Sequence, residues 1–148
     1  MAMGHNPNTI TGANSVILFR CKGIYDNWIK IVGFQVDTAA VFGDVTLGET
    51  RMGVDGLQSG GYVTHETPFT LNLEANSPSI AIMENVYRDF VQNSETRLCE
   101  FKVDLPAVKR SQALSGFMTT KSGGSSVNKL LVGSAYNFNT VSNGSEDI

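Results

Sequence analysis

The sequence has few of the residues on which most protein chemistry depends. Its 148 residues include two cysteines, two histidines, one tryptophan and four prolines. Charged residues make up 17% of the chain, below the usual quarter, while the hydrophobic fraction of 41% is sufficient for a packed core. A chain of this length forms one domain by default and buries roughly 70% of its unfolded surface. The low charge content is suited to buried contact surface.

The charge balance argues against tight binding to nucleic acid. Lys and Arg total 11 against 14 Asp and Glu, which gives a net charge of −3. Binding to a phosphate backbone requires clustered Lys and Arg side chains. Lys109 and Arg110, with Arg97 and Lys102 nearby in the sequence, form a small basic cluster of the kind usual at a solvated strand edge.

Cysteine usage and the hydrophobic pattern predict a reduced, non-membrane protein. Cys21 and Cys99 lie far apart, each inside an apolar strand-like run and without a CxxC partner, and we interpret both as reduced core residues. The chain does not open on a basic stretch followed by an apolar one, and nowhere do 18 apolar residues run together. We therefore expect no membrane insertion, and synthesis and retention in the cytoplasm unless assembly places the protein elsewhere.

The positions of the histidines disfavour histidine chemistry. His5 lies in a polar N-terminal segment, and His65 stands next to Glu66 in an expected turn. Neither a metal site with several imidazoles nor a Ser-His-Asp set is easily assembled from two such residues. We interpret His65 and Glu66 as a surface turn rather than a proton relay, because function requires a convergent site.

Two further patterns do not have the spacing of known sites. The segment GLQSGG at 56–61 lacks the GK[ST] ending of a phosphate-binding loop, and no parallel-sheet unit surrounds it. Asp44, Glu49 and Asp55 do not follow the spacing of a calcium loop. The sequence therefore predicts no catalytic residue, no cofactor and no metal ion, and a protein that is not an enzyme.

Strand-type patterns dominate the chain. The apolar run at 15–21 is followed, after turn residues, by a second run at 28–37, which predicts a hairpin whose second strand is covered on much of both faces. Residues 68–75 and 99–105 alternate between apolar and polar, and each predicts a strand with one buried face. Further strands are expected within 38–63, 107–119 and 129–141, with a flexible loop at 121–128.

One segment predicts an α-helix. Ser77 is placed to cap the free backbone N–H groups, and Pro78 fits the first helical position with its φ angle preset. Apolar residues then recur at helical spacing, and the helix is expected to end near residues 93–94. The apolar stripe consists of Met83, Val86, Tyr87, Phe90 and Val91.

These elements predict an α+β, mainly β domain over residues 15–141. It has two packed antiparallel sheets, as a sandwich or a partly closed barrel, with one α-helix inserted between strands. Residues 1–14, rich in Asn, Thr and Gly, predict a flexible N-terminal arm, and residues 142–148 predict a polar C-terminal tail. Long strands with few edge charges are typical of a protein that completes its sheets with those of a neighbour.

The order of several short motifs resembles that of one protein family. A strand containing VGF (32–34) precedes a Gly-punctuated segment at 42–61, a strand TLNLEA (70–75) and the helix start NSPS (76–79). This order resembles the tail tube proteins of contractile-tailed bacteriophages over residues 15–140, with Ile80 in place of the family's polar residue. The matching residues are Gly53, Asp55, Gly56, Ser59, Gly60, Thr70, Leu71, Leu73, Asn76, Ser77, Pro78 and Ser79.

The resemblance implies a phage tail tube-like fold and a structural function in the virion tail. Six copies would form a homohexameric ring whose inner sheets merge into one barrel, and stacked rings would form a tube whose lumen conducts DNA during ejection. A net charge of −3 is consistent with DNA passing without specific binding, because each added cation strengthens phosphate contacts. The implied partners are further copies of the chain, the tail sheath protein and the baseplate and terminator proteins.

Contacts between subunits or between rings are expected at Gly53, Asp55, Gly56, Ser59 and Gly60. These residues belong to a long exposed hairpin, and the N-terminal arm is a second candidate because it is free to order on binding.

Several alternatives stay open. A secretion-system or bacteriocin tube subunit shares the fold. A monomeric β-sandwich binding module would gather exposed aromatic residues at one loop end, whereas Tyr25, Trp28, Tyr62 and Tyr136 are scattered in the sequence. An unusual enzyme would need a cleft with perturbed carboxylates, and the spacing nominates no pair.

Overall fold

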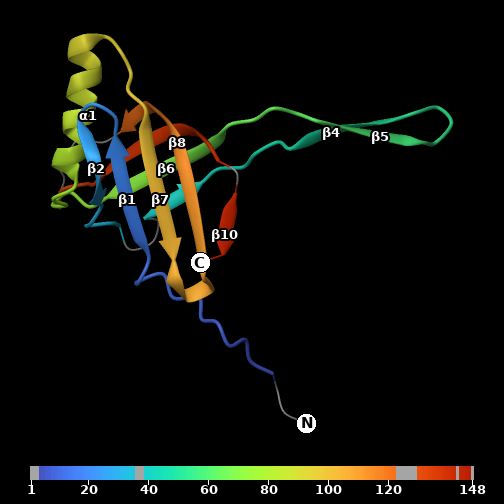
Figure 1. The fold of residues 1–148 in the computed structure, drawn as a ribbon, viewed down its shortest axis with the longest axis horizontal. Coiled ribbons are helices and arrows are strands. Elements are labelled where there is room, and N and C mark those ends of the chain that lie inside the picture. The colour runs from blue at the N-terminus through green and yellow to red at the C-terminus, as the bar shows by residue number, and fades with distance from the viewer. Residues whose placement is uncertain (1–3, 36–38, 123–129, 143, 148) are drawn as a thin grey trace.

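The computed structural model describes residues 4–35, 39–122, 130–142 and 144–147. They form a large antiparallel sheet, a separate two-stranded hairpin and one α-helix (Figure 1). The elements are β1 (Val16–Cys21), β2 (Tyr25–Lys30), β3 (Ala40–Phe42), β4 (Gly48–Met52), β5 (Gln58–Tyr62), β6 (Thr67–Leu73), α1 (Ile80–Asn93), β7 (Cys99–Leu105), a 3₁₀ turn η1 (Pro106–Val108), β8 (Arg110–Ser122), β9 (Ser134–Val141) and β10 (Ser145–Asp147).

The large sheet curls around a single aromatic core. Its strand order is β2-β1-β7-β8-β9-β6-β3, with β10 beside β8. Although β6 and β7 are not neighbours in this order, the ring centroids of Phe69 and Phe101 are 4.8 Å apart. Phe101 also lies 4.8 Å from Phe138 of β9 and 5.1 Å from Phe19 of β1, and all four rings are buried. The predicted class, mainly β with antiparallel sheets and one helix, is confirmed, and the curled sheet is not a closed barrel.

The segment after β2 links β1 to β6, which lie near opposite ends of the strand order in the curled sheet. Ile31 N donates to Ile17 O of β1 at 2.9 Å, and three residues later Phe34 bridges to Leu73 of β6. Between them Gly33 has a φ of +76°, and a Cβ there would lie 2.5 Å from the Ser77 hydroxyl, so this position requires glycine. The chain thus crosses from β1 to β6 across the curled sheet.

The burial pattern predicted for two alternating strands is confirmed, whereas the coverage of both faces predicted for a third strand is wrong. Within 68–75 and 99–105 the apolar positions up to Leu73 and Val103 are buried, and the residues between them are less so. The strand expected at 28–37 to be covered on both faces is instead β2, which ends at Lys30 and forms an edge of the sheet with Trp28 41% exposed. The apolar residues that follow belong to the crossing segment, which explains their hydrophobicity without a second covered face.

The helix α1 begins later than its sequence signals predict and ends where expected. The Ser77 hydroxyl donates to Val32 O at 2.6 Å and accepts from Ser79 N at 3.2 Å. This hydroxyl therefore holds the turn before the helix against the crossing segment, and α1 starts at Ile80. At the other end Ser94 adopts a left-handed φ of 50°, which closes the helix.

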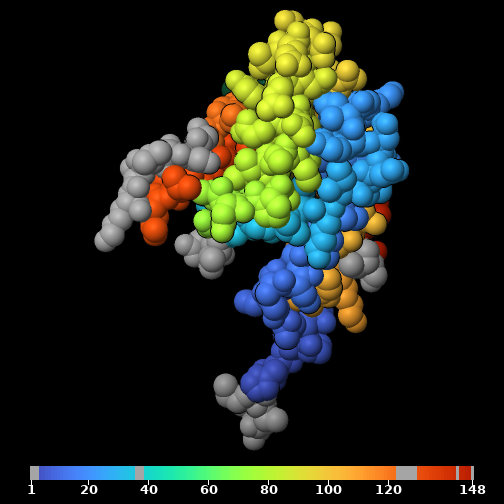
Figure 2. Space-filling model, turned by 90° about the vertical axis from the view of Figure 1, so that its left-hand side faces the viewer, coloured from blue at the N-terminus to red at the C-terminus, as the bar shows by residue number. Residues whose placement is uncertain are grey.

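Polar contacts fix α1 on both sides. In Figure 2 the helix faces the viewer between the β2 region and the end of β8. On the β2 side, Asn85 Nδ2 donates to the Tyr25 hydroxyl at 2.9 Å. On the other side, the Glu84 carboxylate accepts hydrogen bonds from the Tyr136 hydroxyl and from Lys121 Nζ, both at 2.9 Å. On the inner face of α1 the side chains of Met83 and Val86 are buried.

Tyr136 sets an alkaline limit to stability. Burial, followed by the hydrogen bond to Glu84, raises the pKa of Tyr136 above the ordinary tyrosine value of about 10. In the unfolded chain this phenol ionises from about pH 10 while the folded form stays protonated, so the free energy of unfolding falls as the pH rises above about 10. Tyr136→Phe is expected to flatten this fall and to lower the free energy of unfolding by about 1 kcal/mol at neutral pH.

Denaturant titrations at neutral and alkaline pH measure both effects. Tyr62→Phe is the matched control, because Tyr62 is 75% exposed and its removal should leave the alkaline slope unchanged. An alkaline slope that is the same in the Tyr136→Phe variant and the native chain would contradict this role of Tyr136.

The start of β8 is flanked by the C-terminal residues. Ser145 pairs with Gln112 and Asp147 with Arg110, and the Arg110 guanidinium forms an ion pair with the Asp147 carboxylate. The segment expected only as a polar tail is exposed and adds a short edge strand. At the other end of the chain, residues 4–14 are exposed and run away from the body (Figure 1). The loop predicted at 121–128 lies largely outside the described residues.

Glycine is required where β9 passes β8. A Cβ at Gly116 would lie 2.1 Å from Asn139 O and 2.6 Å from Thr140 Cα, which are backbone atoms and cannot rotate away. Gly116→Ala should therefore push the two strands apart and lower the free energy of unfolding by at least about 2 kcal/mol. Gly61→Ala is the control, since no atom lies within 4 Å of a Cβ at that position of β5. Equal melting temperatures for the two variants would contradict the expectation.

Candidate assembly interface

The β4–β5 hairpin projects away from the body of the domain (Figure 1). Its two strands pair with each other in a regular register from Gly48 opposite Tyr62 to Met52 opposite Gln58. Every residue of both strands is exposed. In the described part of the chain neither strand has a second neighbour, so both outer edges present backbone groups that another strand can bind.

Three of the predicted contact residues shape the turn of this hairpin. Gly53 N donates to Leu57 O at 2.8 Å, and Gly56 N donates to Gly53 O at 3.0 Å. The Asp55 carboxylate accepts from Leu57 N at 3.1 Å, and Gly56 has a φ of +84°. This chemistry specifies the turn itself, because Gly favours positive φ and Asp bonds the backbone two residues on.

The other two predicted residues lie on β5, and the structure brings all five together in the outer half of the hairpin. Ser59 is opposite Arg51 and Gly60 is opposite Thr50. With little or no side chain, these positions leave the backbone of β5 open to close approach.

The exposed apolar side chains at the same end of the hairpin were not predicted from the sequence. Met52 is 68% exposed, Leu57 is 70% exposed and Val54 is fully exposed. At the base, Leu47 and Tyr62 are also exposed. The signal was present in the run MGVDGL at 52–57, where apolar residues alternate with turn residues. Exposed apolar groups gathered on one protruding element are typical of contact sites, which makes this hairpin a candidate.

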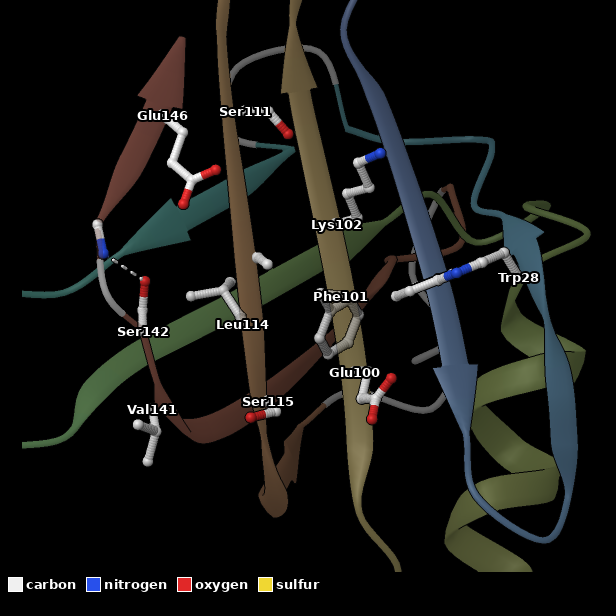
Figure 3. A pocket seen from close by; sticks show the side chains of 12 residues that line it. Trp28, Glu100, Phe101, Lys102, Ser111, Leu114, Ser115, Val141, Ser142 and Glu146 are labelled. Atoms are coloured by element: carbon white, nitrogen blue, oxygen red, sulfur yellow. Dashed lines mark hydrogen bonds between the residues drawn. The ribbon is translucent and has the colours of Figure 1, made fainter. Parts of the chain in front are cut away.

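A groove on the outer face of the sheet is a second candidate contact surface (Figure 3). It has a volume of about 480 Å³ and extends from Trp28 of β2 to Glu146 of β10. Small residues of β8, including Ala113 and Ser115, line it. The Arg20 guanidinium lies 4.6 Å from the Trp28 ring centroid and pairs with a carboxylate of β7, which holds the indole in place.

Comparison with known proteins places the chain in a family. The model of a family described as tail fiber protein gp32 matches residues 8–142. The chain belongs to this family. No curated protein sequence matches it.

Two solved structures share the fold of this tail fiber protein gp32 family member. One is a chain of the anti-feeding prophage (AFP) baseplate, with a TM-score of 0.54 and 13% identity, covering 100% of this chain and 97% of that one. The other belongs to the PVC sheath–tube complex of an extracellular contractile injection system in the extended state, with a TM-score of 0.51 and 11% identity, covering 89% of this chain and 88% of that one. The phage-tail resemblance expected from the motif order is confirmed by the family match and by this fold, which components of contractile injection systems share.

The histidine and the acidic residues considered above do not converge in this gp32-family chain. His65 Nδ1 lies 3.2 Å from Val63 O, and its ring packs edge-on against Tyr62 at a centroid distance of 5.9 Å. Within the described ranges, no three His, Cys, Asp or Glu side chains lie close enough to hold a metal ion. Among those same residues no helix is both long and apolar enough to cross a membrane.

The basic residues and the aromatic residues are likewise dispersed in this family member. Arg97 Nε donates to the Asp89 carboxylate at 2.6 Å, whereas Arg110 pairs with the C-terminal strand. Tyr136 is buried in the core, Trp28 lies on the outer sheet face and Tyr62 stands at the hairpin base. These aromatic side chains do not gather at one loop end, which a monomeric binding module would require.

Proposed function

We propose that this chain is a structural subunit of a bacteriophage tail tube, in which homohexameric rings stack around a hollow lumen. Membership of a tail protein family and the tail-tube-like fold support a structural, non-enzymatic role in the virion. The observation that carries the proposal is the β4–β5 hairpin. It exposes apolar side chains and unpaired strand edges that have no partner elsewhere in the described part of the subunit.

The hairpin acts as the contact element between subunits or between rings. Gly53, Asp55 and Gly56 hold the turn in shape, while Ser59 and Gly60 admit the backbone of a neighbour. Closure of a ring removes exposed strand edges by pairing each with the next copy. The N-terminal arm, exposed over residues 4–14, supplies a second contact that orders on binding.

The finer parts of the proposal concern the lumen and the partners. The lumen conducts DNA during ejection without specific binding, in keeping with the net charge of −3. The outer wall contacts a tail sheath protein, and the tube ends contact baseplate and terminator proteins. The likeness to a contractile injection system complex makes a secretion or bacteriocin tube the second candidate, and it favours a contractile over a non-contractile tail.

Negative-stain electron microscopy of the purified chain at high concentration, with its mass in solution, tests the proposal. Six-membered rings or hollow tubes are the expected result. A monomer that also stays unassembled with baseplate components would overturn the proposal in favour of a binding module. Elongated fibres without a lumen would instead support the fiber role named in the family description.

A further inference from the structure

The two cysteines, 78 positions apart in the chain, lie side by side in the fold. Cys21 ends β1 and Cys99 begins β7, and the two are directly opposite in the register of this strand pair. Both are fully buried. The Cys99 thiol donates to the Cys21 sulfur at an Sγ–Sγ distance of 3.9 Å. Both were predicted from the sequence as core residues, which is confirmed, whereas their pairing was not predicted.

The hydrogen-bond pattern of the two strands favours a covalent link at this pair. Lys22 N donates to Leu98 O at 3.1 Å, so the adjacent pair of residues is the hydrogen-bonded one. Hydrogen-bonded and non-hydrogen-bonded pairs alternate along antiparallel strands, which makes Cys21 and Cys99 a non-hydrogen-bonded pair. In such pairs the Cα atoms are about 4.5 Å apart and the side chains are closest, which falls within the range that disulfides span.

Cys21 is the thiol of the pair that ionises more readily. The hydrogen bond from Cys99 lowers the pKa of the Cys21 thiol, and the nearby Arg97 guanidinium lowers it further, although burial acts in the opposite direction. The same hydrogen bond and burial raise the pKa of Cys99. Cys21 is also the last residue of β1, and the β1–β2 register shifts between Phe19 and Cys21, so a local opening of the adjacent turn would reach this sulfur before that of a residue inside the strand.

We propose that Cys21 and Cys99 form an intrachain disulfide between β1 and β7 when the folded chain meets a low-molecular-weight disulfide such as oxidised glutathione. The Cys21 thiolate attacks one sulfur of the oxidant and displaces a glutathione thiolate, giving a mixed disulfide. Cys99 then loses its proton to solvent, and its sulfur attacks the Cys21 sulfur and displaces the second glutathione. Two protein thiols are oxidised, and one disulfide is reduced to two glutathione thiols.

The disulfide is expected to stabilise the folded chain because it closes a long segment of the chain into a loop. It closes a loop that contains β2 to β6 and α1, and cross-linking a loop of this length restricts the unfolded chain strongly. We expect the melting temperature of the oxidised chain to exceed that of the reduced chain by roughly 10 °C. This inference rests on the fold of one subunit and is independent of the proposed assembly.

Mass spectrometry of the native chain tests the site. The folded protein is incubated with oxidised glutathione, then unfolded in the presence of a thiol-alkylating reagent. The expected product carries no alkyl group and has lost two hydrogens, whereas Cys21→Ala and Cys99→Ala each retain one thiol that is alkylated or glutathionylated. If either variant does not fold, the melting temperatures of the oxidised and the reduced native chain still test the proposal. The oxidised chain is expected to melt at the higher temperature, and equal temperatures would contradict the proposal. Two alkyl groups, a retained glutathione or a covalent dimer of the native chain would each overturn the proposal.

Discussion

Replacing both Val54 and Leu57 with aspartate is expected to weaken assembly strongly while leaving the subunit folded. Both side chains are largely or fully exposed at the hairpin tip, so the free energy of unfolding should change by less than about 0.5 kcal/mol. If the tip is buried by a neighbour, two apolar side chains worth about 1.5–3 kcal/mol each are lost per contact. The critical concentration for assembly should then rise by at least about 100-fold.

Sedimentation and electron microscopy across a concentration series measure this effect. Val54→Met with Leu57→Met is the matched control, because it keeps the tip apolar and should assemble near the native concentration. If the aspartate variant still formed tubes of normal shape, the hairpin tip would not be part of the interface. An aspartate variant that melts at a much lower temperature would show that the tip serves the fold of its own subunit.

Phe101→Ala is expected to produce the largest loss of stability of any single substitution considered. The centroid of the Phe101 ring lies 5.1 Å from that of Phe19 and 4.8 Å from those of Phe69 and Phe138. The ring therefore packs against side chains of three strands, β1, β6 and β9. Removing a buried aromatic ring costs about 3–5 kcal/mol, a large share of the roughly 5–15 kcal/mol that stabilises a domain. A lowered denaturant midpoint is the measurement.

Phe117→Ala makes the same chemical change on the neighbouring strand. The Phe117 ring is 45% exposed, so its loss should change the free energy of unfolding much less. Equal effects of the two substitutions would mean that the rings around Phe101 do not form the centre of the core.

Local patterns predicted the elements whose residues alternate in burial. The strand at Cys99–Leu105 was evident because its apolar residues have a period of two and one face is covered. The helix was evident from its 3.6-residue stripe and its end at Ser94. The start of the helix was misplaced, because Ser77 bonds to Val32, a residue 45 positions earlier that no local pattern reveals.

Features that depend on distant strands could not be read from the sequence. The apolar run after Lys30 resembles the continuation of a strand. In the structure its residues instead form the segment that crosses from β1 to β6. Likewise, Cys21 and Cys99 become neighbours only through the β1–β7 register. For the candidate site, the motif order indicated the hairpin and its turn residues. The exposed apolar tip was not recognised, because an apolar residue beside a glycine is usual in buried turns as well.

The order of the strands in the large sheet has a consequence for the newly made chain. Among the strands of the large sheet, β1 emerges from the ribosome first and can pair at once with β2, but its other partner β7 starts only at Cys99, and β9 follows later still. Phe19 and Phe69 therefore remain uncovered until Phe101 and Phe138 have been translated, whereas the hairpin pairs locally and can form at once. During this interval, neighbouring nascent chains on one messenger RNA expose the apolar side chains of their hairpin tips while their own cores are still incomplete. Slower initiation, which spaces these chains apart, should raise the yield of soluble subunit.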